Sequence, residues 1–253
     1  MEKITKFDLL FFGLIIVALL VFTFVMPPLQ KPDENIHYQR AMTVANGYLS
    51  CPSAEVNIDS RYANFLKILG VMPFNYDEKF YLSDFATVAD ADDGATAIEC
   101  ADGLQVLSYL PSALVLKLSS FIAGSKAPVI GFYAARVLNA ILFLISLIIA
   151  FYWLPKKWKP TFYLMATVPM VLHQVSAISY DAALISLSIM LFAKTLFLFE
   201  KFAADKKVTQ KDFIIYLILL ILIQWVKPGY YFLFLLFFLF PFKRIFKKSS
   251  WRR

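Results

Sequence analysis

Apolar runs of about 20 residues recur along this chain, and they constrain its fold more than any other feature. A helix of that length matches the roughly 30 Å hydrocarbon thickness of a lipid bilayer. Hydrophobic residues make up 60% of the 253 residues and charged residues only 17%, whereas soluble domains average roughly 45–50% and 25%. We therefore expect an all-α integral membrane protein with about six transmembrane helices.

Charged residues and prolines delimit the six candidate spans. The last two are short and share the break Lys227-Pro228-Gly229, which we interpret as a tight reversal of the chain. The segment Leu104–Ile122 is also apolar, but it carries Gln105, Pro111 and Lys117, and we interpret it as an interfacial or re-entrant helix near the outer surface. The expected spans are Phe7–Met26, Ile130–Leu154, Phe162–Ile178, Ala182–Phe199, Phe213–Val226 and Tyr230–Phe242.

The distribution of charge predicts the orientation of these spans. Residues 27–103 hold 12 acidic and five basic side chains, a net charge of −7, so the rest of this +7 chain carries +14. Short cytoplasmic loops are enriched in lysine and arginine, so a cytoplasmic N-terminus and an acidic outer first loop are expected. Because membrane topology accounts for the basic residues, no nucleic-acid partner is expected. The basic clusters are Lys3 and Lys6, Lys156–Lys159, Lys201–Lys211 and Lys243–Arg253.

These features divide the chain into four regions. Residues 1–26 form a cytoplasmic tail and the first transmembrane helix, which we interpret as a signal anchor because no small-residue cleavage pattern follows it. Residues 27–129 form the extracytoplasmic loop with juxtamembrane or re-entrant helices. Residues 130–242 contain transmembrane helices two to six, and residues 243–253 form a basic cytoplasmic tail.

Both cysteines of the chain, Cys51 and Cys100, lie in the outer loop. The oxidising exterior permits a disulfide between them, and two free thiols are the alternative. Neither cysteine belongs to a cluster with the spacing of a structural zinc site.

The stretch that follows the first span has the most chemical content. A helix is predicted from Asp33 to about Asn46, and Asp33, His37 and Arg40 then fall on one face of it. Asp33 and Glu34 are adjacent carboxylates at its start. They are candidates for chemistry at the membrane surface, although either could instead cap the helix and complement its dipole.

The opening pattern Pro-Pro-x-x-x-Pro-Asp-Glu-x-x-His-x-x-Arg-Ala resembles a bacterial membrane-protein family known only as domain of unknown function 2142. Four further stretches match in the same order, and together the five cover about residues 20 to 235. They are Leu107–Pro111, Tyr133–Asn139, Pro169-Met170 with Ser179-Tyr180-Asp181, and Lys227–Tyr230.

That family is similar to the C-type glycosyltransferases, membrane enzymes of the GT-C fold that transfer a sugar from a polyprenyl-phosphate carrier. The resemblance implies that Asp33 is the catalytic base or positions the acceptor, with Asp181 as a second acidic residue at the outer end of a later span. Glu34 is the third candidate catalytic residue. The candidate binding residues are His37, Arg40, Arg136 and Lys227, of which the three cations would face a lipid-linked phosphate.

No cofactor is expected, although one histidine and two carboxylates within a turn could contribute to a divalent-cation site. The expected partners are membrane lipid and a polyprenyl-phosphate-linked sugar. Members of the family usually continue for several more spans, so this chain looks like the N-terminal part, and a protein partner supplying further spans is an additional expectation.

Two other classes of function remain open on the sequence. One is a non-catalytic membrane subunit that binds a lipid-linked sugar or a partner enzyme. The other is a small transporter, against which we count the lack of a second inverted repeat and of charged residues deep in several spans.

Overall fold

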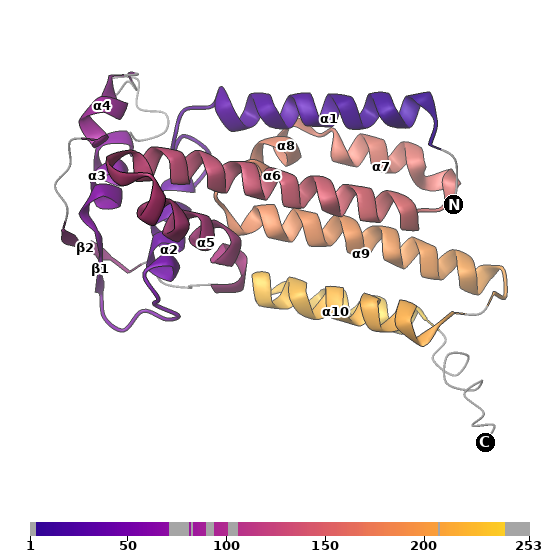
Figure 1. Cartoon of the computed structure of the whole chain (residues 1–253). Helices are drawn as coiled ribbons and strands as arrows, with labels where there is room; N and C mark the ends of the chain where they lie inside the picture. Colours follow the sequence, from indigo (N-terminus) through magenta and orange to yellow (C-terminus); the bar gives the residue numbers. More distant parts are fainter. Residues whose placement is uncertain are drawn as a thin grey trace.

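The computed structural model describes residues 4–70, 81, 83–89, 94–100, 106–206 and 208–240. Within them the fold is a bundle of roughly parallel and antiparallel helices with a smaller helical region packed on one end (Figure 1). Three helical stretches are long and apolar enough to cross a membrane, namely Lys6–Phe24, Gly124–Trp153 and Tyr180–Ala203. The expectation of an all-α membrane fold is therefore confirmed, whereas six spans remain a prediction.

The bundle contains α1 (Lys6–Phe24), α6 (Ala127–Trp153), α9 (Tyr180–Ala203) and α10 (Gln210–Val226). The 3₁₀ helix η3 (Tyr230–Leu239) follows α10 after the turn at Gly229, which has a φ of 120° that favours glycine. Phe237 of η3 packs on Phe213 at the start of α10, with ring centroids 5.6 Å apart. The chain thus reverses at Lys227–Gly229, as the sequence predicts. The end of the last expected span and the tail 243–253 lie outside the described residues.

The expected third span, Phe162–Ile178, is not one helix. It consists of α7 (Lys159–Ala166) and α8 (Pro169–Val175), which follow the short 3₁₀ helix η2 (Lys156–Trp158). The break lies at Val168, whose φ of −57° and ψ of 123° are not helical. Proline disfavours the helical conformation in the residue before it and has no N–H to donate, so Pro169 begins a new helix.

The basic segments between helices meet at one end of the bundle. Ion pairs join Lys157 to Glu200 and Lys159 to Asp8, so the ends of α6 and α9 lie beside the start of α1. At the same end, Lys194 and Lys201 of α9 both bond Asp212 in the first turn of α10, at 2.8 and 2.9 Å. This arrangement agrees with a shared side for the basic clusters.

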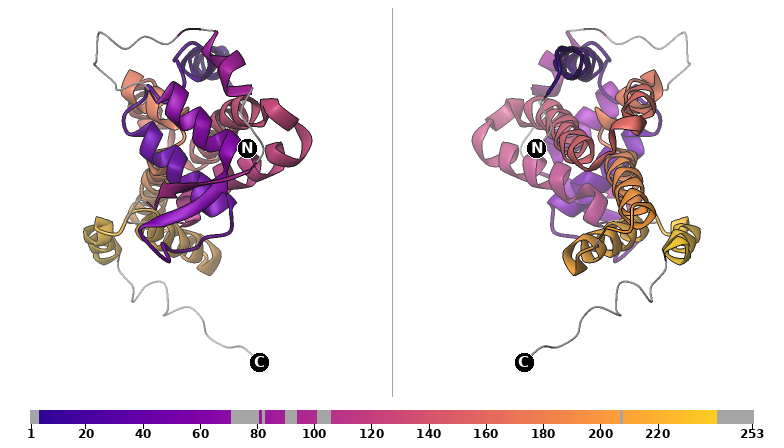
Figure 2. Two further views of the ribbon diagram at one scale, coloured as in Figure 1. Left: turned by 90° about the vertical axis from the view of Figure 1, so that its left-hand side faces the viewer. Right: turned by 90° about the vertical axis from the view of Figure 1, so that its right-hand side faces the viewer.

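The opposite end carries the outer region, which holds α2 (Glu34–Ala45), α3 (Ser60–Leu69), α4 (Asp84–Ala89) and α5 (Val106–Ile122). Figure 2 shows α3 and the strands over the end of the bundle. The short 3₁₀ helix η1 (Gly124–Lys126) connects α5 to α6, against which α5 packs. Buried aromatic side chains join the region to α6, with the Phe65 and Phe132 rings 5.1 Å apart.

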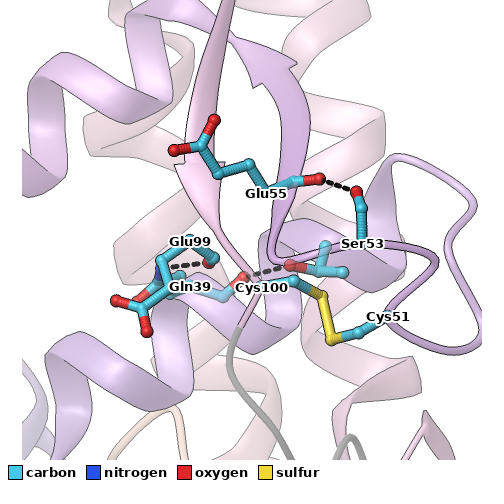
Figure 3. Close-up of a disulfide and its surroundings, with 7 residues drawn as sticks. Gln39, Cys51, Ser53, Glu55, Glu99 and Cys100 are labelled. Atoms are coloured by element: carbon cyan, nitrogen blue, oxygen red, sulfur yellow. Dashed lines mark hydrogen bonds between the residues drawn. A yellow bond between two sulfur atoms is a disulfide. The ribbon is translucent and has the colours of Figure 1, made fainter.

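The outer region also contains a two-stranded antiparallel ribbon that the sequence reading did not predict. Its strands are β1 (Glu55–Asp59) and β2 (Ala95–Glu99), with Asn57 opposite Ala97. A disulfide joins Cys51 to Cys100, with the Cα atoms 5.7 Å apart, at one end of this ribbon (Figure 3). The Cys100 N–H also donates to the carbonyl of Ala54 at 2.8 Å. The ribbon and the disulfide together close the outer loop on itself.

Helix α5 turns its polar side toward the protein and its apolar side outward. Its buried face includes Ser108, Ser112 and Ser119, whereas Leu114, 68% exposed, projects away from the core. An apolar stripe of this kind is unfavourable in water and favourable against lipid. The exposed stripe consists of Leu110, Leu114, Leu118, Phe121 and Ile122.

We predict that this stripe contacts the outer leaflet of the membrane. A spin label at Leu114→Cys should collide more often with oxygen, which partitions into lipid, than with a water-soluble nickel chelate. A label at Lys67→Cys on α3, an exposed position of the same region, should show the reverse. Equal, water-like accessibility at both positions would contradict the interfacial assignment of α5.

Candidate functional site

A buried arginine lies beneath the outer end of the bundle. Arg136 of α6 has no exposed surface, and its five N–H groups meet five acceptor contacts. Nε and Nη2 donate to the two oxygens of Glu34 at 2.9 and 2.5 Å. The other donors reach the carbonyls of Thr23, Met26 and Pro27 at 2.8 to 3.0 Å. Arg136 therefore fixes the chain between α1 and α2 onto α6.

Three more contacts fix the segment between α8 and α9 to the same place. Glu34 Oε1 also accepts the Ile178 N–H at 3.0 Å. Asn139, one turn after Arg136, donates to the Ala177 carbonyl at 2.7 Å. Lys31 donates to the carbonyl and the hydroxyl oxygen of Ser176 at 2.6 and 2.7 Å. We call Lys31, Glu34, Arg136, Asn139 and Ser176 the buried polar layer.

The buried polar layer holds the two predicted site carboxylates in place. Lys31 and Glu34 flank Asp33 in the chain, and their partners Ser176 and Ile178 come shortly before Asp181. Since both pairs of contacts are direct hydrogen bonds, the backbones that carry Asp33 and Asp181 are tied together from below. The layer is therefore a positioning element for the surface above it.

Lys31 and Ser176 resemble a serine–lysine catalytic pair, but their environment argues against that role. Burial, followed by repulsion from Arg136, lowers the pKa of Lys31 to about 7. However, neither residue has exposed surface, and the Ser176 hydroxyl lies 2.9 Å from the Leu172 carbonyl, which can accept its proton. A substrate cannot reach this hydroxyl in the structure, so we assign both residues to the layer.

Above the layer, side chains from four helices converge. His37 of α2 lies 2.7 Å from the Tyr109 hydroxyl of α5, and its ring meets that of Tyr180 edge-on with centroids 4.8 Å apart. Lys227, at the end of α10, lies 4.6 Å from the Tyr180 ring and 3.8 Å from Asp181. We call Asp33, His37, Arg40, Tyr109, Tyr180, Asp181 and Lys227 the outer cluster.

Burial and charge keep His37 neutral. Its pKa is lowered to about 4, first because burial disfavours the charged imidazole and next because the Arg40 guanidinium repels it. Asp33 and Glu34 act in the opposite direction, and Lys227 adds to the lowering. These electrostatic interactions show that both acidic and basic groups of the cluster lie near His37.

Asp33 has an unusual backbone conformation for a residue at the start of a helix. Its φ is 54° and its ψ is 15°, in the left-handed region that few residues other than glycine adopt. It occupies the N-cap position of α2, yet its side chain makes no capping hydrogen bond. The side chain is exposed and forms no ion pair with any described residue. Such strain is typical of functional positions, so Asp33 fits a role in chemistry better than a role in capping.

The structure separates the predicted site residues into two groups. Asp33, His37, Arg40, Asp181 and Lys227 converge in the outer cluster. Glu34 and Arg136, expected as a catalytic and a binding residue, instead pair with each other and are completely buried. They do not face a substrate here, because each satisfies the charge of the other inside the protein.

Sequence reasoning missed Tyr109, Tyr180, Lys31 and Asn139 as parts of the site. All but Lys31 lie in stretches that carry the family resemblance, and Lys31 lies inside the opening pattern at an unspecified position. Their positions were therefore visible, whereas their contacts depend on the tertiary fold. Among the described residues, no group of three or more histidine, cysteine or acidic side chains has the geometry of a metal site.

The family model described as "Predicted membrane protein (DUF2142)" matches residues 14–252. The chain belongs to this family. The matched region includes the buried polar layer and the outer cluster, so both belong to the part that this DUF2142 protein shares with its family. No curated protein and no solved structure matches the chain.

We predict that Arg136→Lys destabilises the DUF2142 protein by about 3–5 kcal/mol, since it leaves Glu34 and backbone carbonyls without partners in the interior. Thermal unfolding in detergent would measure the loss. The control is Arg61→Lys, because Arg61 pairs with Asp59 near the surface, where such pairs contribute about 0–1 kcal/mol. An equal loss in both variants would show that Arg136 is not the anchor of the outer end.

Proposed function

We propose that this protein is a membrane glycosyltransferase, or the N-terminal half of one, that transfers a sugar from a polyprenyl-phosphate donor to an extracytoplasmic acceptor such as a cell-surface glycan. The observation that carries the proposal is Asp33. It is an exposed carboxylate held in a strained conformation beside Asp181, Lys227 and a neutral histidine. The family resemblance stated above supplies the reaction class.

The proposed chemistry is a single displacement. An acceptor hydroxyl gives its proton to the Asp33 carboxylate while its oxygen attacks the anomeric carbon of the donor sugar. The bond from that carbon to the phosphate oxygen breaks, and the lipid phosphate leaves with the electron pair. Because attack and departure occur on opposite faces of the sugar, the anomeric configuration is inverted.

The outer cluster offers groups for both ends of this displacement. Lys227 and Arg40 are cations that can stabilise the negative charge developing on the leaving phosphate. Lys227 keeps its charge at neutral pH: burial opposes protonation, but the hydrogen bond with Tyr180 and the charge of Asp181 raise its pKa overall. Asp181 orients Lys227 through their ion pair. Glu34 and Arg136 contribute indirectly, by positioning the backbone of Asp33.

The location of the cluster also supports a lipid-linked substrate. Tyr109 lies on the inner face of α5, and the apolar stripe of the same helix faces outward. If that stripe lies in the outer leaflet, the cluster lies near the level of the headgroups. A phosphate on a polyprenyl chain occupies that level, because the chain stays in the hydrocarbon and the phosphate in water.

A non-catalytic subunit that binds a lipid-linked sugar is the second candidate. It is favoured by the ion pair between Asp181 and Lys227, which already satisfies part of the charge of the cluster. Such a subunit needs the cations for binding, but it needs no proton acceptor at position 33. The two candidates therefore differ in what they require of Asp33.

We predict that Asp33→Asn lowers the rate of sugar transfer by roughly 10²–10⁴-fold, the usual contribution of a general base. Asparagine also tolerates the left-handed conformation, so the substitution removes the charge without a new backbone strain. The measurement is the amount of surface glycan, or of transfer by purified membranes, at an equal protein level.

The chain offers a matched control for this variant. Asp205 is an exposed aspartate with a φ of 50° that lies at the basic end of the bundle. Asp205→Asn repeats the same chemical change in the same backbone conformation far from the cluster, and it should leave the glycan unchanged. If Asp33→Asn behaves like Asp205→Asn, Asp33 is not the base, and the non-catalytic subunit becomes the better account.

A further inference from the structure

The contact between His37 and Tyr109 is buried and short. Nδ1 of His37 lies 2.7 Å from the Tyr109 hydroxyl oxygen, while 4% of His37 and 1% of Tyr109 are exposed. The two residues lie 72 positions apart, on α2 and α5. A hydrogen bond in this position can run in either direction, so its polarity has to come from the neighbouring groups.

Arg40 determines the polarity. Its side chain forms a hydrogen bond with Tyr109, and a guanidinium can only donate. The Tyr109 oxygen is therefore an acceptor toward Arg40, and its own proton needs an acceptor elsewhere. Nδ1 of His37 is the acceptor at hydrogen-bond distance among the described residues. Burial raises the pKa of Tyr109 to about 12, so this proton remains on the hydroxyl at neutral pH.

A neutral imidazole carries one proton on its two nitrogens. If Nδ1 accepts from Tyr109, the proton of His37 must be on Nε2. That nitrogen has no hydrogen-bond partner in the described part of the chain, so it remains for a ligand. The groups that act on the ring are Asp33, Glu34 and Arg40 from its own segment, Tyr109 of α5, Tyr180 of α9, and Lys227 after α10.

We propose that Tyr109 is a positioning residue that locks His37 in the tautomer with its proton on Nε2, so that His37 presents a fixed hydrogen-bond donor to an anionic oxygen of the substrate. The substrate role rests on the proposed function, whereas the locked tautomer does not. An Nε2–H group cannot bind a metal ion or accept a proton. His37 is thereby assigned to substrate binding, and Asp33 keeps the role of base.

Spectroscopy can test the tautomer directly, because the chain has only two histidines, His37 and His173. In a His173→Gln background, the ¹⁵N resonances of labelled imidazole report His37 alone. We expect a protonated Nε2, an acceptor-type Nδ1, and no titration between about pH 5.5 and 8, since the pKa of His37 is about 4. A protonated Nδ1, or titration near the ordinary pKa of histidine, would overturn the proposal.

Tyr109→Phe removes the hydroxyl and should release the tautomer. We expect a mixture of Nδ1–H and Nε2–H forms and a higher pKa for His37, because a bond to its neutral form is lost. The control is Tyr62→Phe. Tyr62 is also completely buried and bonds the Leu116 carbonyl of α5 at 2.9 Å, but it forms no contact with His37. A Tyr109→Phe spectrum like that of the Tyr62→Phe protein would refute the positioning role.

The functional part of the proposal has a separate readout. Tyr109→Phe should reduce sugar transfer and introduce a dependence on pH near neutrality that the Tyr62→Phe control lacks. If the spectra are as expected but transfer is unaffected by Tyr109→Phe and His37→Phe, the substrate role of His37 is wrong. In that case a loss of transfer in Asp33→Asn would still support the proposed function, so the two failures can be distinguished.

Discussion

The interaction on which the outer half of this protein depends is the buried pairing of Arg136 with Glu34. An isolated charge at this depth would be costly, and it is tolerated because each partner neutralises the other and every guanidinium donor has an acceptor. The geometry of the guanidinium also selects what it holds, since three of its acceptors are backbone carbonyls at the end of α1. One side chain thus joins the end of the first span to the middle of the outer region.

The consequence of this pairing is a site assembled from distant parts of the sequence. The five stretches that carry the family resemblance meet at the outer end of the bundle, and each contributes either to the buried polar layer or to the outer cluster. Ser108 of α5 also lies 3.3 Å from the Val226 carbonyl, which holds the end of α10 near the same place. The carboxylates and cations are therefore mounted on helices that are fixed from below, as a site that must hold a substrate in one geometry requires.

Much of this arrangement could be predicted from the sequence because membrane proteins obey simple rules of length and charge. The apolar runs located α1, α6, α9 and α10, the cysteines indicated their disulfide, and the pattern around Asp33 gave α2 nearly residue for residue. What could not be predicted depends on burial. Nothing local distinguishes Asp33 from Glu34, yet one is exposed and the other is bonded inside the protein. The break at Val168 had a visible cause in Pro169, but the apolar run around it concealed the interruption.

The most direct test of the account is whether Asp33 truly faces the start of α9 and the end of α10 in the membrane. A photoactivatable amino acid placed at position 33 of the protein in native membranes would report its neighbours after illumination and mass spectrometry. The account predicts cross-links to peptides that contain Tyr180 and Asp181 or Lys227. Cross-links confined to lipid, or to the basic end around Lys156 and Lys201, would contradict the convergence on which the proposed site is built.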